Sequence, residues 1–182
     1  SMACWHRRTG AALSPVISWQ DRRNAAWLER LAPQAARIRE LTGLVLTPHY
    51  GARKMRWCLD HLPAVQAAQA SGDLVMGPLA SFLACRLLEG GPLLADPANA
   101  SRTQLWSLAT RGWSPELLSL FGIDRAVLPR TVTSRHDYGR LATPAGPVPL
   151  TVVTGDQSAV PFAFGPLDPA IAYVNLGTGA FA

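Results

Sequence analysis

Proline and glycine interrupt this chain so often that it cannot contain long regular elements. Its 182 residues include 15 Pro and 15 Gly, and 48% of them are hydrophobic while 16% are charged. A chain of this length and composition can bury a sizeable core and is not disordered. Helical patterns that alternate with short apolar runs predict an α/β fold with about three or four strands, fewer than a complete sheet needs.

Apolar spacing and turn residues predict where the elements lie. A helix is expected to begin at about Arg22, with Asp21 as its N-cap and Thr42-Gly43 at its end. Other helices are expected at about 52–61, 63–71, 79–89 and 115–121, the last with Ser114 as N-cap. Buried strands are expected at 15–19, 147–153 and 170–176, and an edge strand at 73–76. The ranges 92–108 and 129–149 are expected to be loops and turns.

Membrane and nucleic-acid partners are not expected from this composition. The most apolar stretch, Leu79 to Leu88, contains Ser81 and Arg86 and is shorter than the roughly 20 residues of a spanning helix. The formal net charge is +5 and Lys54 is the single lysine, but the arginines are scattered and form no basic stripe. Three widely spaced cysteines without a Cys-x-x-Cys motif predict a reducing, cytoplasmic setting.

Two short motifs could carry chemistry, because each follows a predicted strand. They are Gly155-Asp156-Gln157 and Gly177-Thr178-Gly179. At one sheet edge, Asp156 could accept a hydroxyl proton while the glycine turn holds a phosphate, which suits phosphoryl transfer. By spacing alone the favoured alternative is structural, with Asp156 capping its helix and Gly-Thr-Gly forming a hairpin turn. The tail also matches a loose dinucleotide fingerprint, but the helix that this motif requires does not follow it.

The motifs together resemble the FGGY carbohydrate kinases, and among these the glycerol kinases. Their shared order along almost the whole chain is more specific than any single motif. The resemblance implies a partial ribonuclease H-like (actin-like ATPase) domain without its first strands or the second domain. Residues 1–182 would then be an incomplete N-terminal substrate-binding domain. The matching segments are Ile17-Ser18-Trp19-Gln20-Asp21-Arg22-Arg23, 41–48, Lys54-x-x-Trp57-x-Leu59-Asp60, 96–103, Gly155-Asp156-Gln157 and Gly177-Thr178-Gly179-x-Phe181.

The resemblance also implies roles for individual residues. Asp156 matches the family's catalytic base, which also contacts the substrate. Trp19 matches a tryptophan that packs on the polyol carbons, and Phe181 matches a phenylalanine of the substrate pocket; a core role is the alternative for each. His49 stands where glycerol kinases have a substrate-contacting tyrosine, so the resemblance leaves the exact polyol open. The turn that contacts the ATP phosphates would be Gly177, Thr178 and Gly179.

The implied reaction is transfer of the ATP γ-phosphoryl group, with Mg²⁺, to a hydroxyl of glycerol or a related polyol. The family's first phosphate loop and its second domain fall outside the sequence, so the 182-residue piece alone is expected to be inactive. Two alternatives remain open: a kinase for a pentulose, hexulose or sugar alcohol, and a non-catalytic binding module that kept the fold. Homo-oligomer formation is open too, and apolar surface is expected near both ends.

Overall fold

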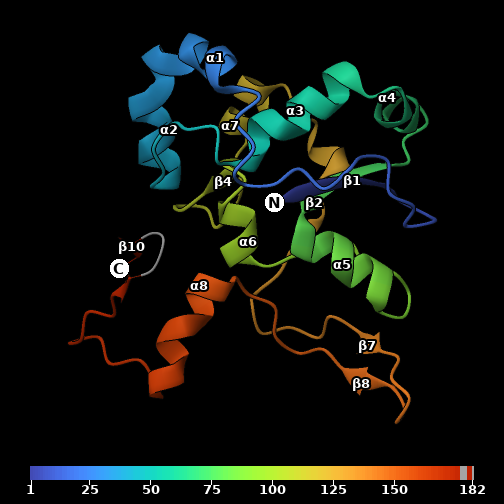
Figure 1. Ribbon diagram of the computed structural model, residues 1–182, viewed down its shortest axis with the longest axis vertical. Coiled ribbons are helices and arrows are strands. Elements are labelled where there is room, and N and C mark those ends of the chain that lie inside the picture. The colour runs from blue at the N-terminus through green and yellow to red at the C-terminus, as the bar shows by residue number, and fades with distance from the viewer. Residues whose placement is uncertain (177–179, 182) are drawn as a thin grey trace.

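The structure is a computed structural model that describes residues 1–176 and 180–181, and it has the predicted α/β character (Figure 1). The helices are α1 (Ala25–Leu28), α2 (Ala35–Thr42), α3 (Gly51–His61), α4 (Pro63–Ala70), α5 (Leu79–Leu87), α6 (Pro97–Ser101), α7 (Pro115–Phe121) and α8 (Asp156–Ala159). Short 3₁₀ helices cover Glu29–Gln34, Arg125–Val127 and Val160–Phe164. The strands are β1 (Met2–His6), β2 (Leu74–Pro78), β3 (Leu94–Ala95), β4 (Trp106–Ser107), β5 (Gly112–Trp113), β6 (Arg130–Thr131), β7 (Arg140–Leu141), β8 (Val148–Pro149), β9 (Asn175–Leu176) and β10 (Ala180–Phe181).

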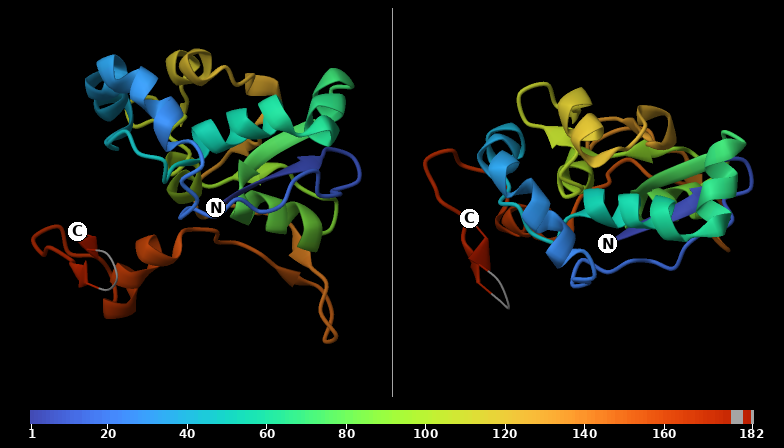
Figure 2. Two further views of the ribbon diagram at one scale, coloured as in Figure 1. Left: turned by 45° about the horizontal axis from the view of Figure 1, so that its top comes forward. Right: turned by 90° about the horizontal axis from the view of Figure 1, so that it is seen from above.

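An antiparallel pair of strands forms the centre of the fold. Strand β1 pairs with β2 in a register that runs from Met2 opposite Pro78 to His6 opposite Leu74. Helices α3 and α4 pack on one side of this pair and α5 on the other (Figures 1 and 2). The strand predicted at 73–76 is therefore confirmed as β2, although it is buried along its whole length. Strand β1 lies where the sequence predicts no element.

The helices begin and end near their predicted signals. Helix α2 ends at Gly43, whose φ of 71° places it in the left-handed region that favours glycine. The Ser114 hydroxyl accepts a hydrogen bond from the Leu117 backbone N–H at 3.3 Å and so caps α7, as predicted. The prediction for Asp21 is wrong, because the first helix starts only at Ala25 and has Asn24 as its N-cap. Helix α6 lies in a range that was expected to be a loop.

Three expected strands are much shorter than predicted. In the range 15–19, only Ile17 forms a bridge, to Met2. The ranges 147–153 and 170–176 are reduced to β8 and β9 plus one bridge at Val152. Proline explains part of this outcome, because Pro15, Pro147 and Pro149 have no backbone N–H to donate to a neighbouring strand. Residues that were expected to be buried are exposed instead, including Val148 at 50% and Val152 at 53%.

Apolar exposure is concentrated in the last part of the chain. Phe162 and Phe164 leave 63% and 77% of their surface exposed, whereas the side chains of Met2 to Trp5 are fully buried. The expectation of exposed apolar surface is therefore confirmed near the C-terminal end and wrong near the N-terminal end. Within the described ranges, none of the helices combines the length and hydrophobicity of a transmembrane helix.

Candidate functional site

Two of the predicted substrate-binding residues stack on each other. The Trp19 and His49 rings lie with centroids 5.1 Å apart and planes inclined by 17°. Trp19 belongs to the turn that follows Ile17, and His49 belongs to the loop that leads into α3. About half of the Trp19 surface (49%) remains exposed, so the alternative of a core tryptophan does not hold. The stack presents flat apolar area beside an imidazole that can form hydrogen bonds, which suits a polyol.

Lys54 on helix α3 connects the two loops that carry this stack. Its Nζ donates hydrogen bonds to the backbone carbonyls of Ser18 at 2.7 Å, Trp19 at 3.0 Å and His49 at 2.9 Å. An ammonium group has three N–H donors, so all of them are used. The side chain is only 1% exposed. Sequence reasoning did not assign Lys54 a role; the available signal was that the chain's single lysine lies inside one of the quoted motifs.

Burial and neighbouring cations determine the charge state of this region. Burial is the main cause that lowers the pKa of Lys54 to about 8; the negative charge of Asp21 opposes this shift, and the positive charge of Arg23 adds to it. Burial also lowers the pKa of His49, and the positive charges of Lys54, Arg22 and Arg102 act in the same direction. His49 is therefore neutral at physiological pH, with one ring nitrogen as donor and the other as acceptor for hydroxyl groups.

A second set of contacts holds the Trp19 segment against α3. The Asp21 carboxylate accepts hydrogen bonds from Arg23 Nε and from Arg23 Nη2, the latter at 2.7 Å. The Arg23 guanidinium in turn lies 4.2 Å from the centre of the Trp57 ring, a cation–π contact with α3. The hydrogen bonds from Arg23 lower the pKa of Asp21, so this carboxylate stays ionised and the contact persists at neutral pH.

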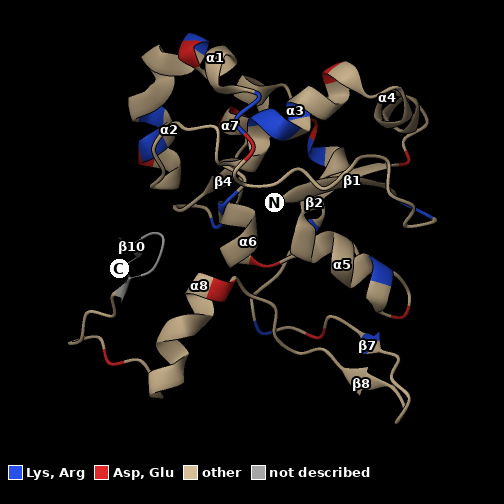
Figure 3. Ribbon diagram, in the orientation of Figure 1, with Lys and Arg blue, Asp and Glu red and all other residues tan. Residues whose placement is uncertain are grey.

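Asp156 is the first residue of α8 and is exposed to solvent. Gly155 is the N-cap of this helix, and the Asp156 carboxylate accepts a hydrogen bond from the Gln157 backbone N–H at 2.7 Å. The structural alternative, in which Asp156 serves as N-cap, is therefore wrong. Figure 3 shows an acidic position at the start of α8, below α6, and the basic stretch of α3 above α6. In the described part of the chain, no hydrogen bond, ion pair or ring contact joins Asp156 to Trp19 or His49.

The remaining predicted site residues are at the end of the chain. Gly177, Thr178 and Gly179 lie outside the described residues, and Phe181 is described only as a position in β10, opposite Asn175 of β9. Their roles stay predictions. Among the described residues, no group of three or more His, Cys, Asp or Glu side chains is placed to hold a metal ion.

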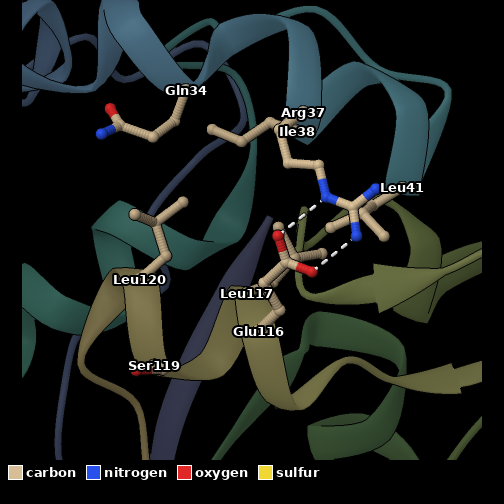
Figure 4. Close-up of a pocket in the computed structure, with 8 residues that line it drawn as sticks. All are labelled: Gln34, Arg37, Ile38, Leu41, Glu116, Leu117, Ser119 and Leu120. Carbon is tan, nitrogen blue, oxygen red and sulfur yellow. Dashed lines mark hydrogen bonds and ion pairs between the residues drawn. The ribbon is translucent and has the colours of Figure 1, made fainter.

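A hollow of about 270 Å³ lies away from these residues, between α2 and α7 (Figure 4). Arg37 crosses it and donates two hydrogen bonds of 2.8 Å to the Glu116 carboxylate. None of the predicted site residues lines this hollow, so it is not part of the candidate site. Its lining residues are Gln34, Arg37, Ile38, Leu41, Glu116, Leu117, Ser119 and Leu120.

Comparison with known proteins identifies the family. The N-terminal domain of the FGGY family of carbohydrate kinases matches residues 1–174. The chain is 39% identical, over 98% of its length, to the glycerol kinase of Methylobacterium radiotolerans, and 40% identical, over 97%, to that of Geobacter sp. strain M21. It spans 36% and 37% of the length of these two relatives. The chain therefore belongs to the FGGY family of carbohydrate kinases, as the order of motifs predicted.

Solved structures share its fold. The crystal structure of Plasmodium falciparum glycerol kinase with ADP matches with a TM-score of 0.82 and 25% identity, over 89% of this chain and 33% of that one. A xylulose kinase from Rhodospirillum rubrum matches with a TM-score of 0.74 and 21% identity, over 90% and 35% of the two chains. The predicted fold class, an α/β unit of the actin-like ATPase type, is confirmed.

Proposed function

We propose that residues 1–182 form an incomplete N-terminal substrate-binding domain of an ATP-dependent kinase for glycerol or a related polyol. The observation that carries this proposal is the exposed stack of Trp19 and His49, fastened by Lys54, in a chain of a carbohydrate kinase family. The relatives named as glycerol kinases support glycerol as the acceptor. The full-length kinase denotes the protein that contains this chain.

In this proposal, the stack binds the acceptor. The exposed part of the Trp19 ring packs against the carbon chain of the polyol, where apolar surface is removed from water. The neutral His49 ring offers one donor and one acceptor to neighbouring hydroxyls. The binding surface is formed from backbone segments whose carbonyls are held by Lys54, so the rings are positioned before the acceptor arrives.

Asp156 supplies the general base. Its carboxylate accepts the proton of the acceptor hydroxyl as the hydroxyl oxygen forms a bond to the γ-phosphorus and the bond to ADP breaks. The support for this role is the matching Gly155-Asp156-Gln157 motif and an exposed side chain on a helix whose N-cap residue is Gly155. Nothing in the described residues pairs this carboxylate with a cation, so the proton acceptor is not already neutralised.

ATP would be contacted through Gly177, Thr178 and Gly179, the segment that resembles the family's phosphate turn. The ADP in the P. falciparum structure supports nucleotide use by the family fold. Mg²⁺ is usually bound by one or two carboxylates together with substrate phosphates.

Replacing Trp19 with alanine in the full-length kinase is expected to raise the KM for glycerol by about tenfold, with a much smaller change in kcat. The reason is that the ring contributes apolar contact equally to the bound substrate and to the transition state. Steady-state kinetics measure both constants. Trp19→Phe is the matched control, because it keeps a flat ring and should lose less affinity; an unchanged KM in Trp19→Ala would place the acceptor elsewhere.

The function itself is tested by measuring ADP formation by the full-length kinase with ATP, Mg²⁺ and a panel of acceptors. Glycerol is expected to give the highest kcat/KM among glycerol, a pentulose, a hexulose and a sugar alcohol. A preference for a pentulose would overturn the glycerol assignment in favour of a pentulose kinase. The absence of acceptor-dependent ADP formation would overturn the kinase proposal and favour a binding module.

A further inference from the structure

We infer that Lys54 is a positioning residue of the acceptor site, whose ammonium group fixes the Trp19 segment and the His49 loop relative to each other. This inference rests on the proposed function, in which the two rings bind the acceptor. Lys54 itself does not touch the stack's exposed face. It acts through the main chain of the residues that do, because its hydrogen bonds end on the carbonyls of Ser18, Trp19 and His49.

The geometry makes Lys54 the link between two segments that are distant in sequence. Ser18 and Trp19 are 36 and 35 residues away from Lys54, and His49 precedes it by five. The only other main-chain donor to any of these three carbonyls in the described chain is the Asp21 N–H, which reaches Ser18 at 3.1 Å. The carbonyls of Trp19 and His49 therefore depend on the ammonium group for a hydrogen-bond partner within the described protein.

The part of helix α3 that carries Lys54 is tightly packed. Lys54 lies in the first half of α3, between Arg53 and Met55, and all three side chains are buried. Met55 and Leu59 from the same helix belong to the main hydrophobic core. A buried aliphatic stem on a packed helix leaves the ammonium group little freedom to move, so three short hydrogen bonds set the separation of the two loops.

The charged groups that face the ammonium group are Asp21, which favours its protonated form, and Arg23, which disfavours it. His49 and the amino group of Ser1 also lie within its electrostatic reach. Because burial lowers the Lys54 pKa to about 8, the side chain loses one of its three donors as pH rises through that value. One carbonyl is then left without a donor, and the hold on the two loops weakens.

Acceptor binding and stability should respond to this titration in opposite directions. Between pH 8 and the ordinary lysine pKa of about 10.5, the unfolded chain binds more protons at this group than the folded one. The titration of Lys54 by itself therefore increases the free energy of unfolding as pH rises through that window. The KM for the acceptor rises over the same window because the loops are held less firmly. If Lys54 had only a structural role, the KM would not rise while the free energy of unfolding increases.

The test compares wild-type full-length kinase with Lys54→Met, which keeps the length of the side chain but has no donors, and with Lys54→Arg, which stays charged. The KM for glycerol is measured from pH 6 to pH 10. For the wild type it is expected to rise several-fold above pH 8. For Lys54→Met it is expected to be about tenfold higher at pH 7, with no further rise, because hydrogen bonds to a charged group are lost. Lys54→Arg should give a smaller increase and no inflection near pH 8.

Arg56→Met is the matched control, since it removes a cation from the same helix without touching either loop; its KM should stay near wild type. Urea unfolding confirms that each variant is folded at pH 7. A wild-type KM and pH profile for Lys54→Met would overturn the positioning role while the proposed function stands. If the wild type shows no kinase activity, amide hydrogen exchange still decides the point: exchange at 18–20 and 49–50 should quicken about tenfold in Lys54→Met. Unchanged exchange there would overturn the inference.

Discussion

Replacing Asp156 with asparagine in the full-length kinase is expected to lower kcat with glycerol by a factor of about 10² to 10⁴, the usual contribution of a positioned general base. The asparagine amide has nearly the same size and can still accept the hydrogen bond from the Gln157 N–H, so helix α8 should start at the same place. The KM for glycerol should change little, because Trp19 and His49 are untouched. Steady-state kinetics at saturating ATP and Mg²⁺ measure both constants.

Asp168→Asn is the control for this substitution. Asp168 is also an exposed carboxylate in the last part of the chain, and its Oδ1 accepts a hydrogen bond from the Ala170 N–H, which an asparagine can replace. Its kcat should remain near wild type. Near-normal turnover by Asp156→Asn would contradict the assignment of Asp156 as base, whatever the other residues of the site do.

The largest effect on stability is expected from Trp5→Ala, at about 3–5 kcal/mol of lost unfolding free energy. Trp5 is completely buried on β1, and its ring centroid lies 5.5 Å from that of Phe82 on α5. The ring also packs on Gly77 of β2, where an added Cβ would come within 3.2 Å of Trp5 Cη2. Alanine would leave a cavity between the strand pair and α5, which the two strands cannot close without losing their register.

Urea denaturation followed by circular dichroism measures this loss. Trp19→Ala is the matched control, because it removes the same side chain from a half-exposed position and should lower the unfolding free energy by much less, about 1–2 kcal/mol. Equal destabilisation by the two substitutions would contradict the placement of Trp5 in the core. A fall of only about 1 kcal/mol in Trp5→Ala would do so as well.

The helices could be predicted from sequence because their signals are local. Helices α3, α4, α5 and α7 combine a spacing of three and four between apolar residues with a proline, serine or glycine at their ends. The family resemblance rests on other positions, among them a segment inside α3 and one that spans α6. Its prediction of an α/β fold of the actin-like ATPase type is confirmed.

The strands could not be predicted as well, because their hydrogen-bond partners are distant. Strand β1 pairs with residues about 70 positions later in the chain, and no local pattern within Met2–His6 predicts that pairing. The apolar range 147–153 shows the reverse error. It has the composition of a buried strand, but its two prolines limit pairing and leave β8 short and exposed, although Leu150 and Val153 pack against a small core cluster.

Some residues of the candidate site could be predicted from the sequence and others could not. Trp19 and His49 could be found because they stand at positions that match the family's motifs, and the structure brings them together. Lys54 could not, because its role depends on three main-chain carbonyls that a sequence does not display. Asp156 was found as a motif residue, and its place at the start of α8, with Gly155 as the cap, separates it from a simple helix signal.

The central claim is that Trp19, His49 and Asp156 belong to one acceptor site, and a crystal structure of the full-length kinase with bound glycerol tests it most directly. We expect the glycerol carbons to lie against the Trp19 ring and one hydroxyl to hydrogen-bond to His49. The reacting hydroxyl is expected about 2.6–3.2 Å from an Asp156 carboxylate oxygen, or joined to it through one water. Glycerol bound away from the Trp19 ring, or with its hydroxyls beyond the reach of Asp156, would contradict it.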